Sequence, residues 1–107
     1  MERHQVRIWH KTDNIWFNPE EFFLNEKGAL LVNLAMFTVE EFTNMLDTKG
    51  KQIFVGDIVK CWDGENGVVY FDKEQLQYRV RFGDGDDDDL ATSEPLVMGN
   101  IHEGIQK

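Results

Sequence analysis

The sequence has one cysteine, two prolines and no long apolar run, and each shortage excludes a class of protein. With Cys61 alone, no intramolecular disulfide can form, which favours a reducing compartment. No run of about 18 apolar residues occurs, and no basic segment followed by an apolar stretch opens the chain. These absences predict a soluble cytoplasmic protein without membrane contact.

Basic residues are also scarce, with 11 Lys and Arg against 20 Asp and Glu and a net charge of −9. Nucleic-acid binding draws most of its affinity from neutralised phosphates, so this balance disfavours it unless a local basic patch prevails. The simplest consequence of the acidity is solubility. A length of 107 residues allows one domain, or one small barrel with an appended lobe.

Side chains that could carry catalysis lack the necessary spacing. His4, His10 and His102 make no metal-binding pattern with one another or with Cys61. Cys61 stands in an alternating apolar segment, which favours a buried thiol over a nucleophile. No glycine-rich loop ends in the Lys-Ser/Thr pair of a phosphate cradle. We therefore expect no enzyme activity and no cofactor.

The aspartate run at residues 84–89 is the one segment that suggests a cation. An EF-hand loop needs Gly at its sixth position and Glu at its twelfth. Counted from Asp84, these positions hold Asp89 and Pro95. The pattern fails, so we expect no metal site and a solvated acidic loop.

The N-terminal segment alternates in the way that a β-hairpin requires. Residues 6–11 place Val, Ile and His on one side and Arg, Trp and Lys on the other, residues 12–14 suit a turn, and residues 15–17 a returning strand. Residues 20–25 fit a helical turn or a strand, and the apolar run 29–37 fits a buried strand or a helix. Thr38 begins a capping-box pattern, which predicts one short helix over residues 39–46.

The segment Ile53–Trp62 organises the C-terminal half. Two β-rich runs flank Gly56 and Asp57. Glycine can adopt a positive φ, and an Asp that follows it can accept main-chain N–H bonds. We therefore expect a sharp corner that starts a curled sheet.

After this corner the sequence predicts a meander of short strands joined by turns. Asp-Gly and Asn-Gly in residues 63–67 are strong hairpin signals. Residues 76–82 alternate cleanly, with Leu, Tyr, Val and Phe on one face and Gln77, Arg79 and Arg81 on the other. Gly99 interrupts the last strand and indicates a bulge or kink. Such a meander over roughly 50 residues suggests an SH3-like barrel.

The predicted fold is therefore mainly β in two parts. Residues 1–46 form an N-terminal lobe with a hairpin, an apolar strand and one short helix. Residues 47–107 form a small SH3-like barrel.

The sequence resembles the YopX family of phage and prophage proteins at three motifs in the same order. The first is Arg-x-Trp-x-Lys, the second extends from Thr43 to the Gly-Asp-Ile-Val of the corner, and the third is Gly-Asn-Ile. The departures are Asn44 for Gly, Met45 for Leu and His10 for Asp. The motif residues for which we expect a structural role are Arg7, Trp9, Asp47, Gly50, Gly56, Asp57, Gly99 and Asn100. The resemblance implies an SH3-like barrel behind an irregular lobe in a phage accessory protein, and it implies no catalytic residue.

We expect a non-catalytic module that acts through protein contacts, as a homo-oligomer or with a host or phage protein. Trp16, Trp62, Arg79 and Arg81 are the candidate interaction surface. One alternative is an acidic DNA mimic that inhibits a host nucleic-acid-binding protein. A second is weak nucleic-acid binding through Arg79 and Arg81, although pairing of these arginines with the chain's own aspartates is favoured.

Overall fold

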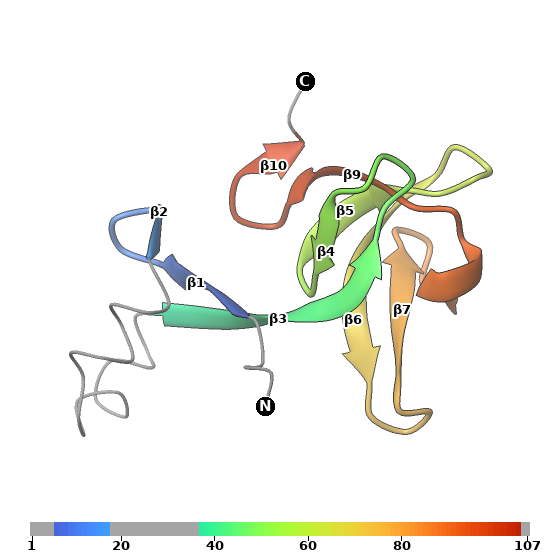
Figure 1. Ribbon diagram of the computed structural model, residues 1–107, viewed down its shortest axis with the longest axis horizontal. Helices are drawn as coiled ribbons and strands as arrows, with labels where there is room; N and C mark the ends of the chain where they lie inside the picture. The colour runs from blue at the N-terminus through green and yellow to red at the C-terminus, as the bar shows by residue number, and fades with distance from the viewer. Residues whose placement is uncertain (1–5, 18–36, 106–107) are drawn as a thin grey trace. The chain divides into compact units, whose positions relative to one another are not determined.

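Strands dominate the computed structural model, which describes residues 6–17 and 37–105 (Figure 1). The strands are β1 (Val6–His10), β2 (Ile15–Phe17), β3 (Phe37–Leu46), β4 (Gln52–Phe54), β5 (Asp57–Lys60), β6 (Asn66–Asp72), β7 (Gln77–Phe82), β8 (Asp87–Asp89), β9 (Leu96–Asn100) and β10 (Gly104–Ile105). A 3₁₀ turn, η2, covers Leu90–Thr92. The mainly β class is confirmed. In the described ranges no helix is long and apolar enough to cross a membrane.

The chain divides into two compact units, Met1–Glu41 and Phe42–Lys107. The division falls inside β3, and the boundary suggested by the sequence, after residue 46, lies at the end of the same strand. The expectations for residues 20–25 and for most of the run 29–37 lie outside the described residues.

The first unit contains the predicted hairpin, which is confirmed. β1 pairs with β2 in antiparallel register, with Trp9 opposite Trp16, and the two indole rings meet edge to face at 4.9 Å. Ile8 and Trp9 are neighbours on opposite faces of β1, yet both are buried. Both faces of this strand are therefore covered.

The short helix predicted over residues 39–46 is wrong, because these residues belong to β3. The first half of β3 pairs with β1 and its second half with β4. Glu40 lies opposite Arg7, and the Arg7 Nε donates to the Glu40 carboxylate at 2.9 Å. Tertiary strand pairing therefore outweighs the local capping signal.

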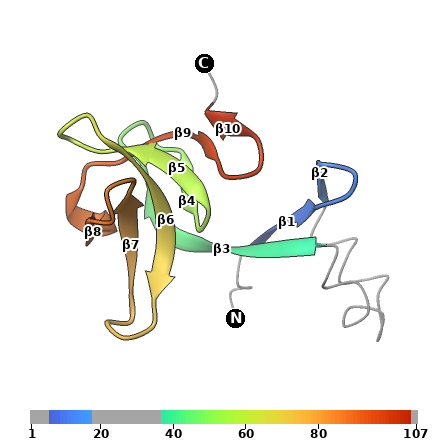
Figure 2. The ribbon, with the colours of Figure 1, turned by 180° about the vertical axis from the view of Figure 1, so that it is seen from behind.

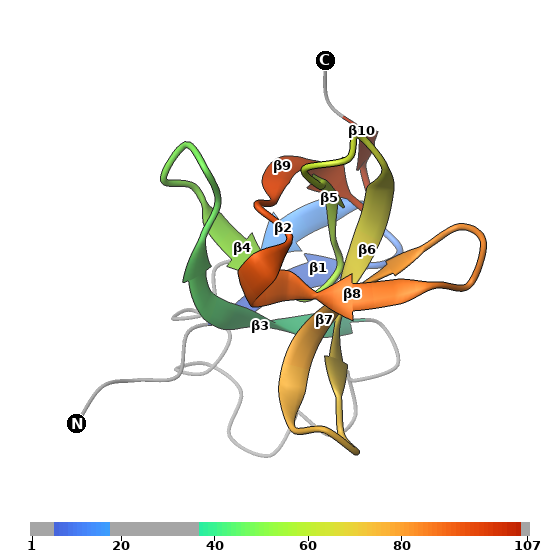
Figure 3. The ribbon, with the colours of Figure 1, turned by 90° about the vertical axis from the view of Figure 1, so that its right-hand side faces the viewer.

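The second unit contains a six-stranded sheet in the order β10-β9-β5-β6-β7-β8. Figure 2 shows β5, β6 and β7 side by side, and Figure 3 shows how the sheet curls into an open half-barrel. Its inner face packs a core of Ile53, Val59, Cys61, Val69, Val80 and Leu90. The Cys61 thiol is buried, as predicted, and burial raises its pKa.

Leu76 was expected to share one strand face with Tyr78, Val80 and Phe82, and this is wrong. It lies in the turn before β7 with a φ of 54° and is 76% exposed. Val80, three positions into the strand, is fully buried as the alternation requires. The predicted alternation of inward and outward side chains therefore begins at Gln77, the first residue of β7.

The predicted bulge at Gly99 is confirmed. Ile58 pairs with Gly99 while the next residue, Val59, pairs with Val97, so β9 has one extra residue here. A Cβ on Gly99 would overlap the carbonyl oxygen of Gly104 on β10. Only glycine permits this approach of the two backbones.

Gly99→Ala should therefore destabilise the protein by about 1–3 kcal/mol, as overpacking does. The matched control is Gly83→Ala, because nothing lies within 4 Å of the added Cβ there. Urea unfolding followed by circular dichroism measures both changes. Equal stabilities of the two variants would contradict this role of Gly99.

Candidate functional site

The Gly-Asp corner between β4 and β5 has the predicted geometry. Gly56 has a φ of 93°, and the Phe54 N–H donates to the Asp57 carboxylate at 2.8 Å. The Gly56 N–H donates to the Val69 carbonyl, and the Ile101 N–H donates to the Gly56 carbonyl, each at 2.9 Å. The corner is therefore bonded to the middle of β6 and to the residue that follows β9, and Asp57 is 1% exposed.

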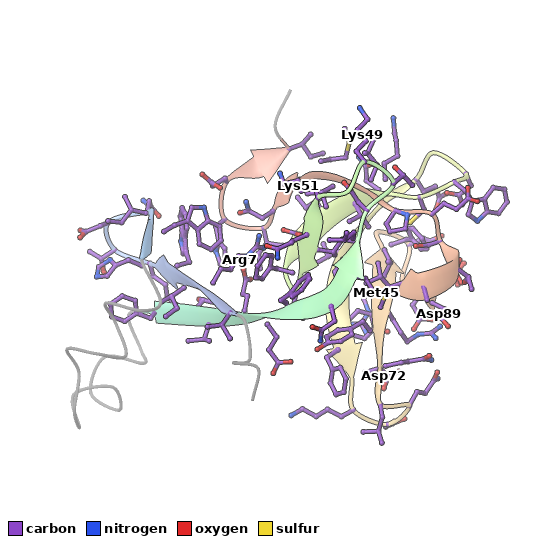
Figure 4. All side chains as sticks on the ribbon, in the orientation of Figure 1. Arg7, Met45, Lys49, Lys51, Asp72 and Asp89 are labelled. Atoms are coloured by element: carbon purple, nitrogen blue, oxygen red, sulfur yellow. The ribbon has the colours of Figure 1, made fainter. Side chains whose placement is uncertain are left out.

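Asp47 ties a turn to a distant strand. Its Oδ1 accepts hydrogen bonds from the N–H groups of Lys49 and Lys51, labelled in Figure 4, at 2.9 and 2.8 Å. Its Oδ2 accepts from the Val97 N–H on β9 at 2.9 Å. Burial alone raises the pKa of Asp47, but these hydrogen bonds outweigh it, and the pKa lies below its ordinary value. The turn itself needs Gly50, which has a φ of 85°.

The remaining motif residues are also structural. Asn100 closes the β9–β10 turn, since its Oδ1 accepts from the N–H groups of His102 and Glu103 at 3.0 and 2.9 Å. In the first unit Trp9 is buried and Arg7 pairs with Glu40. The motif residues thus occupy separate turns and strands, where they hold backbone in place.

The outward face of β6, β7 and β8 carries a polar cluster. The Arg79 Nε and the Tyr70 hydroxyl both donate to the Asp87 Oδ2, at 2.9 and 2.6 Å. These two bonds lower the pKa of Asp87 to about 2, with the larger effect from Arg79. The predicted pairing of Arg79 with the acidic run is confirmed.

Arg81 has a different environment on the same face. Its guanidinium lies over the Tyr70 ring, 4.4 Å from the centroid, and the side chain is exposed. No carboxylate within the described ranges forms an ion pair with it. Arg81 lies opposite Asp87 and contributes, less than Arg79, to the lowered pKa of that carboxyl, but its own guanidinium lies on an aromatic ring rather than in an ion pair.

An open groove of about 460 Å³ runs along this face beside Arg81. Its lining residues are Ile58, Asn66, Gly67, Val68, Tyr70, Arg81, Phe82 and Gly83. Most of these are apolar, and Phe82 also packs against the core, whereas Ile58 and Val68 hold outward positions of their strands. The groove was not predicted from the sequence, although Ile58 and Val68 are apolar at positions of their strands that face away from Val59 and Val69.

The four candidate interaction residues do not form one set. Arg79 and Arg81 share the outward face of β7, and Trp62 lies in the β5–β6 loop, 70% exposed. Trp16 belongs to the first unit, where its ring contacts Trp9 and the Arg7 guanidinium. Of the four, Arg81 alone lines the groove.

The solvated loop predicted at residues 84–89 holds for Asp84–Asp86, which form an exposed turn, and is wrong for Asp87–Asp89, which form β8 and pair with β7. The Asp84 carboxylate accepts the Asp86 N–H, and the Asp89 carboxylate (Figure 4) accepts the Ala91 N–H and begins η2. No group of three His, Cys, Asp or Glu side chains in the described part of the chain could hold a metal ion. These carboxylates instead fix the backbone locally.

Asp47→Asn should lower the free energy of unfolding by about 1–3 kcal/mol, because a partly buried N–H loses its acceptor. An amide has one acceptor atom, so it cannot serve both Val97 and the Lys49–Lys51 turn. Asp72→Asn is the control, since both bonds of Asp72 go to one oxygen. Urea unfolding at pH 7 measures the stability of both variants. Equal stabilities would contradict the claim that Asp47 links its turn to β9.

Arg79→Gln should raise the pKa of Asp87 from about 2 toward 3.8. Since the folded-state pKa is depressed, the stabilisation is complete above pH 3.8 and disappears as the pH falls through about 2. Carboxyl ¹³C NMR titration measures the shift. The control is Arg81→Gln, which removes only the weakest cause and should shift the pKa less. An unchanged pKa in Arg79→Gln would contradict the cluster.

The family model described as YopX protein matches residues 25–105 of the 107. The match includes the Asp47 turn, the Gly56–Asp57 corner and the Gly99–Asn100 bulge, whereas Arg7 and Trp9 precede it. No curated protein matches the chain significantly. Since the match covers most of the sequence, the chain belongs to the YopX family.

Proposed function

We propose that this protein is a phage-encoded accessory protein that works in the host cytoplasm as a non-catalytic protein-interaction module, and that it does so as a homo-oligomer. The observation that carries the proposal is the apolar groove on the outward face of β5, β6 and β7. Exposed apolar surface with a polar rim is typical of interaction sites. Family membership fits a phage protein and supplies no activity.

The groove suits a polypeptide because it combines apolar and charged contacts. Ile58 and Val68 lie opposite each other in the ladder, and Arg81 is the next residue along the same row. An apolar side chain could lie on the two aliphatic residues while a carboxylate bonds the guanidinium. Tyr70 holds the guanidinium in place, which reduces the entropy lost on binding.

The SH3-like architecture is part of the same proposal. The curled antiparallel sheet and its short strands support it (Figure 3). Small barrels of this type host many functions, so the fold alone does not identify the function of this chain. The groove and its chemistry, rather than the barrel type, support a role in protein contacts.

The two alternatives have less support from the same surface. Direct nucleic-acid binding would use Arg79 and Arg81, but Asp87 neutralises Arg79. DNA mimicry would use the acidic run, but carboxylates of Asp84, Asp87 and Asp89 bond partners within the chain. Protein contact through the groove remains the function that we propose.

A groove-blocking variant tests this function. Val68→Glu places a carboxylate in the centre of the groove, and Leu46→Glu places one at a 58% exposed site on β3. Wild-type and variant chains are immobilised, and the polypeptides captured from phage-infected cells are quantified by mass spectrometry. At least one polypeptide should bind wild type and Leu46→Glu and fall by roughly tenfold with Val68→Glu. Identical captured sets would contradict the proposal.

A further inference from the structure

Trp62 is the large aromatic side chain most exposed to solvent among the described residues, at 70%. It lies in the loop between β5 and β6, which projects beyond the sheet (Figure 1). A tryptophan can bury roughly 150–250 Å² of surface in a contact, so it is an effective anchor when a partner covers it. The indole therefore supplies a large apolar contact that the chain itself does not use.

The loop that carries Trp62 is held by its own backbone bonds. The Trp62 N–H donates to the Ser93 carbonyl at 3.0 Å, and the Cys61 N–H donates to the Glu65 carbonyl at 2.9 Å. The Gly64 N–H donates to the Cys61 carbonyl, also at 2.9 Å. A pre-organised anchor loses little conformational entropy when it binds.

The charges of this loop complement those of the groove. Asp63 and Glu65 follow Trp62 in the same loop and are exposed. Arg81 lines the groove and forms no ion pair in the described ranges, although Asp87 lies opposite it on β8. Exposed Lys60 lies beside the groove, opposite the lining residue Asn66 in the β5–β6 register. An indole followed by two carboxylates thus complements an apolar groove that is lined by one cation, Arg81, and has a second, Lys60, beside it.

We propose that the groove receives the Trp62 loop of a second copy of this chain, with Trp62 on Ile58 and Val68 and with Asp63 or Glu65 beside Arg81. The inference rests on the proposed interaction function and names its partner surface. Asn66 and Gly67 of the groove directly follow the loop in sequence. A two-fold axis beside this hairpin would therefore form the contact twice, as an isologous dimer.

Two such contacts make a small interface, so the dimer is weak and depends on concentration. The net charge of −9 on each chain opposes association, which makes the local charge match more important. An acidic peptide of another protein and a nucleic-acid strand are the competing occupants of the groove, and the experiment separates them from a second copy.

Sedimentation equilibrium of the full chain up to about 500 µM tests the inference at one ionic strength. Wild type should dimerise, and Trp62→Ala and Arg81→Glu should each raise the dimer Kd by roughly tenfold or more. Arg81→Glu combined with Asp63→Arg and Glu65→Arg should restore the Kd to within about threefold of wild type, because the charge match is reversed. Leu76→Ser, at an exposed site outside the groove, should leave the Kd unchanged.

Several outcomes overturn the inference. A monomeric wild type, or a dimer that neither Trp62→Ala nor Arg81→Glu weakens, would exclude docking of a second copy. If a monomer still captures a polypeptide in a Val68-dependent way, the interaction function stands and an acidic peptide is the occupant. If a mobility shift with single-stranded DNA depends on Arg81, nucleic acid is the occupant. A monomer without Val68-dependent capture would refute both the inference and the function.

Discussion

The Gly56–Asp57 corner is the constraint on which the second unit depends. A positive φ at Gly56 turns the chain, and the Asp57 carboxylate accepts the Phe54 N–H across the turn. The strand that starts here, β5, lies between β6 and β9 in the sheet. The corner therefore fixes the strand on which the core and the outward groove are both built, with Val59 inward and Ile58 outward.

Carboxylates hold much of the remaining backbone. Asp47, Asp57, Asp84 and Asp89 each accept main-chain N–H bonds at a turn or at the start of η2. Such bonds satisfy donors that a tight turn cannot pair with carbonyl groups. Part of the high acidity of the chain is thus a consequence of its turn-rich architecture.

The features that sequence predicted correctly depend on neighbours along the chain. The hairpin at residues 6–17, the corner at Gly56 and the bulge at Gly99 each follow from local turn chemistry and alternation. The β3 strand was mistaken for a helix because its pairing with β1 lies some thirty residues away, as the Arg7–Glu40 bond shows. The residues around β3 in the sequence carry no information about its pairing with β1.

The candidate site was only partly predictable for the same reason. Alternation placed Arg79 and Arg81 on one face of β7, and opposite charge predicted the pairing of Arg79 with the aspartate run. The groove forms because strand pairing places Ile58 opposite Val68 and Val68 opposite Arg81. Strand register is a tertiary property, so the sequence shows apolar residues at outward positions of separate strands but not that they form one row.

The most direct test of an outward interaction surface is a series of ¹H–¹⁵N NMR spectra recorded at increasing protein concentration. The account predicts that the Trp62 indole N–H and the amides of Ile58, Val68 and Arg81 shift together, with one midpoint, while the Leu76 amide stays fixed. Shifts confined to other residues, or groove amides that stay fixed while Trp62 moves, would contradict it.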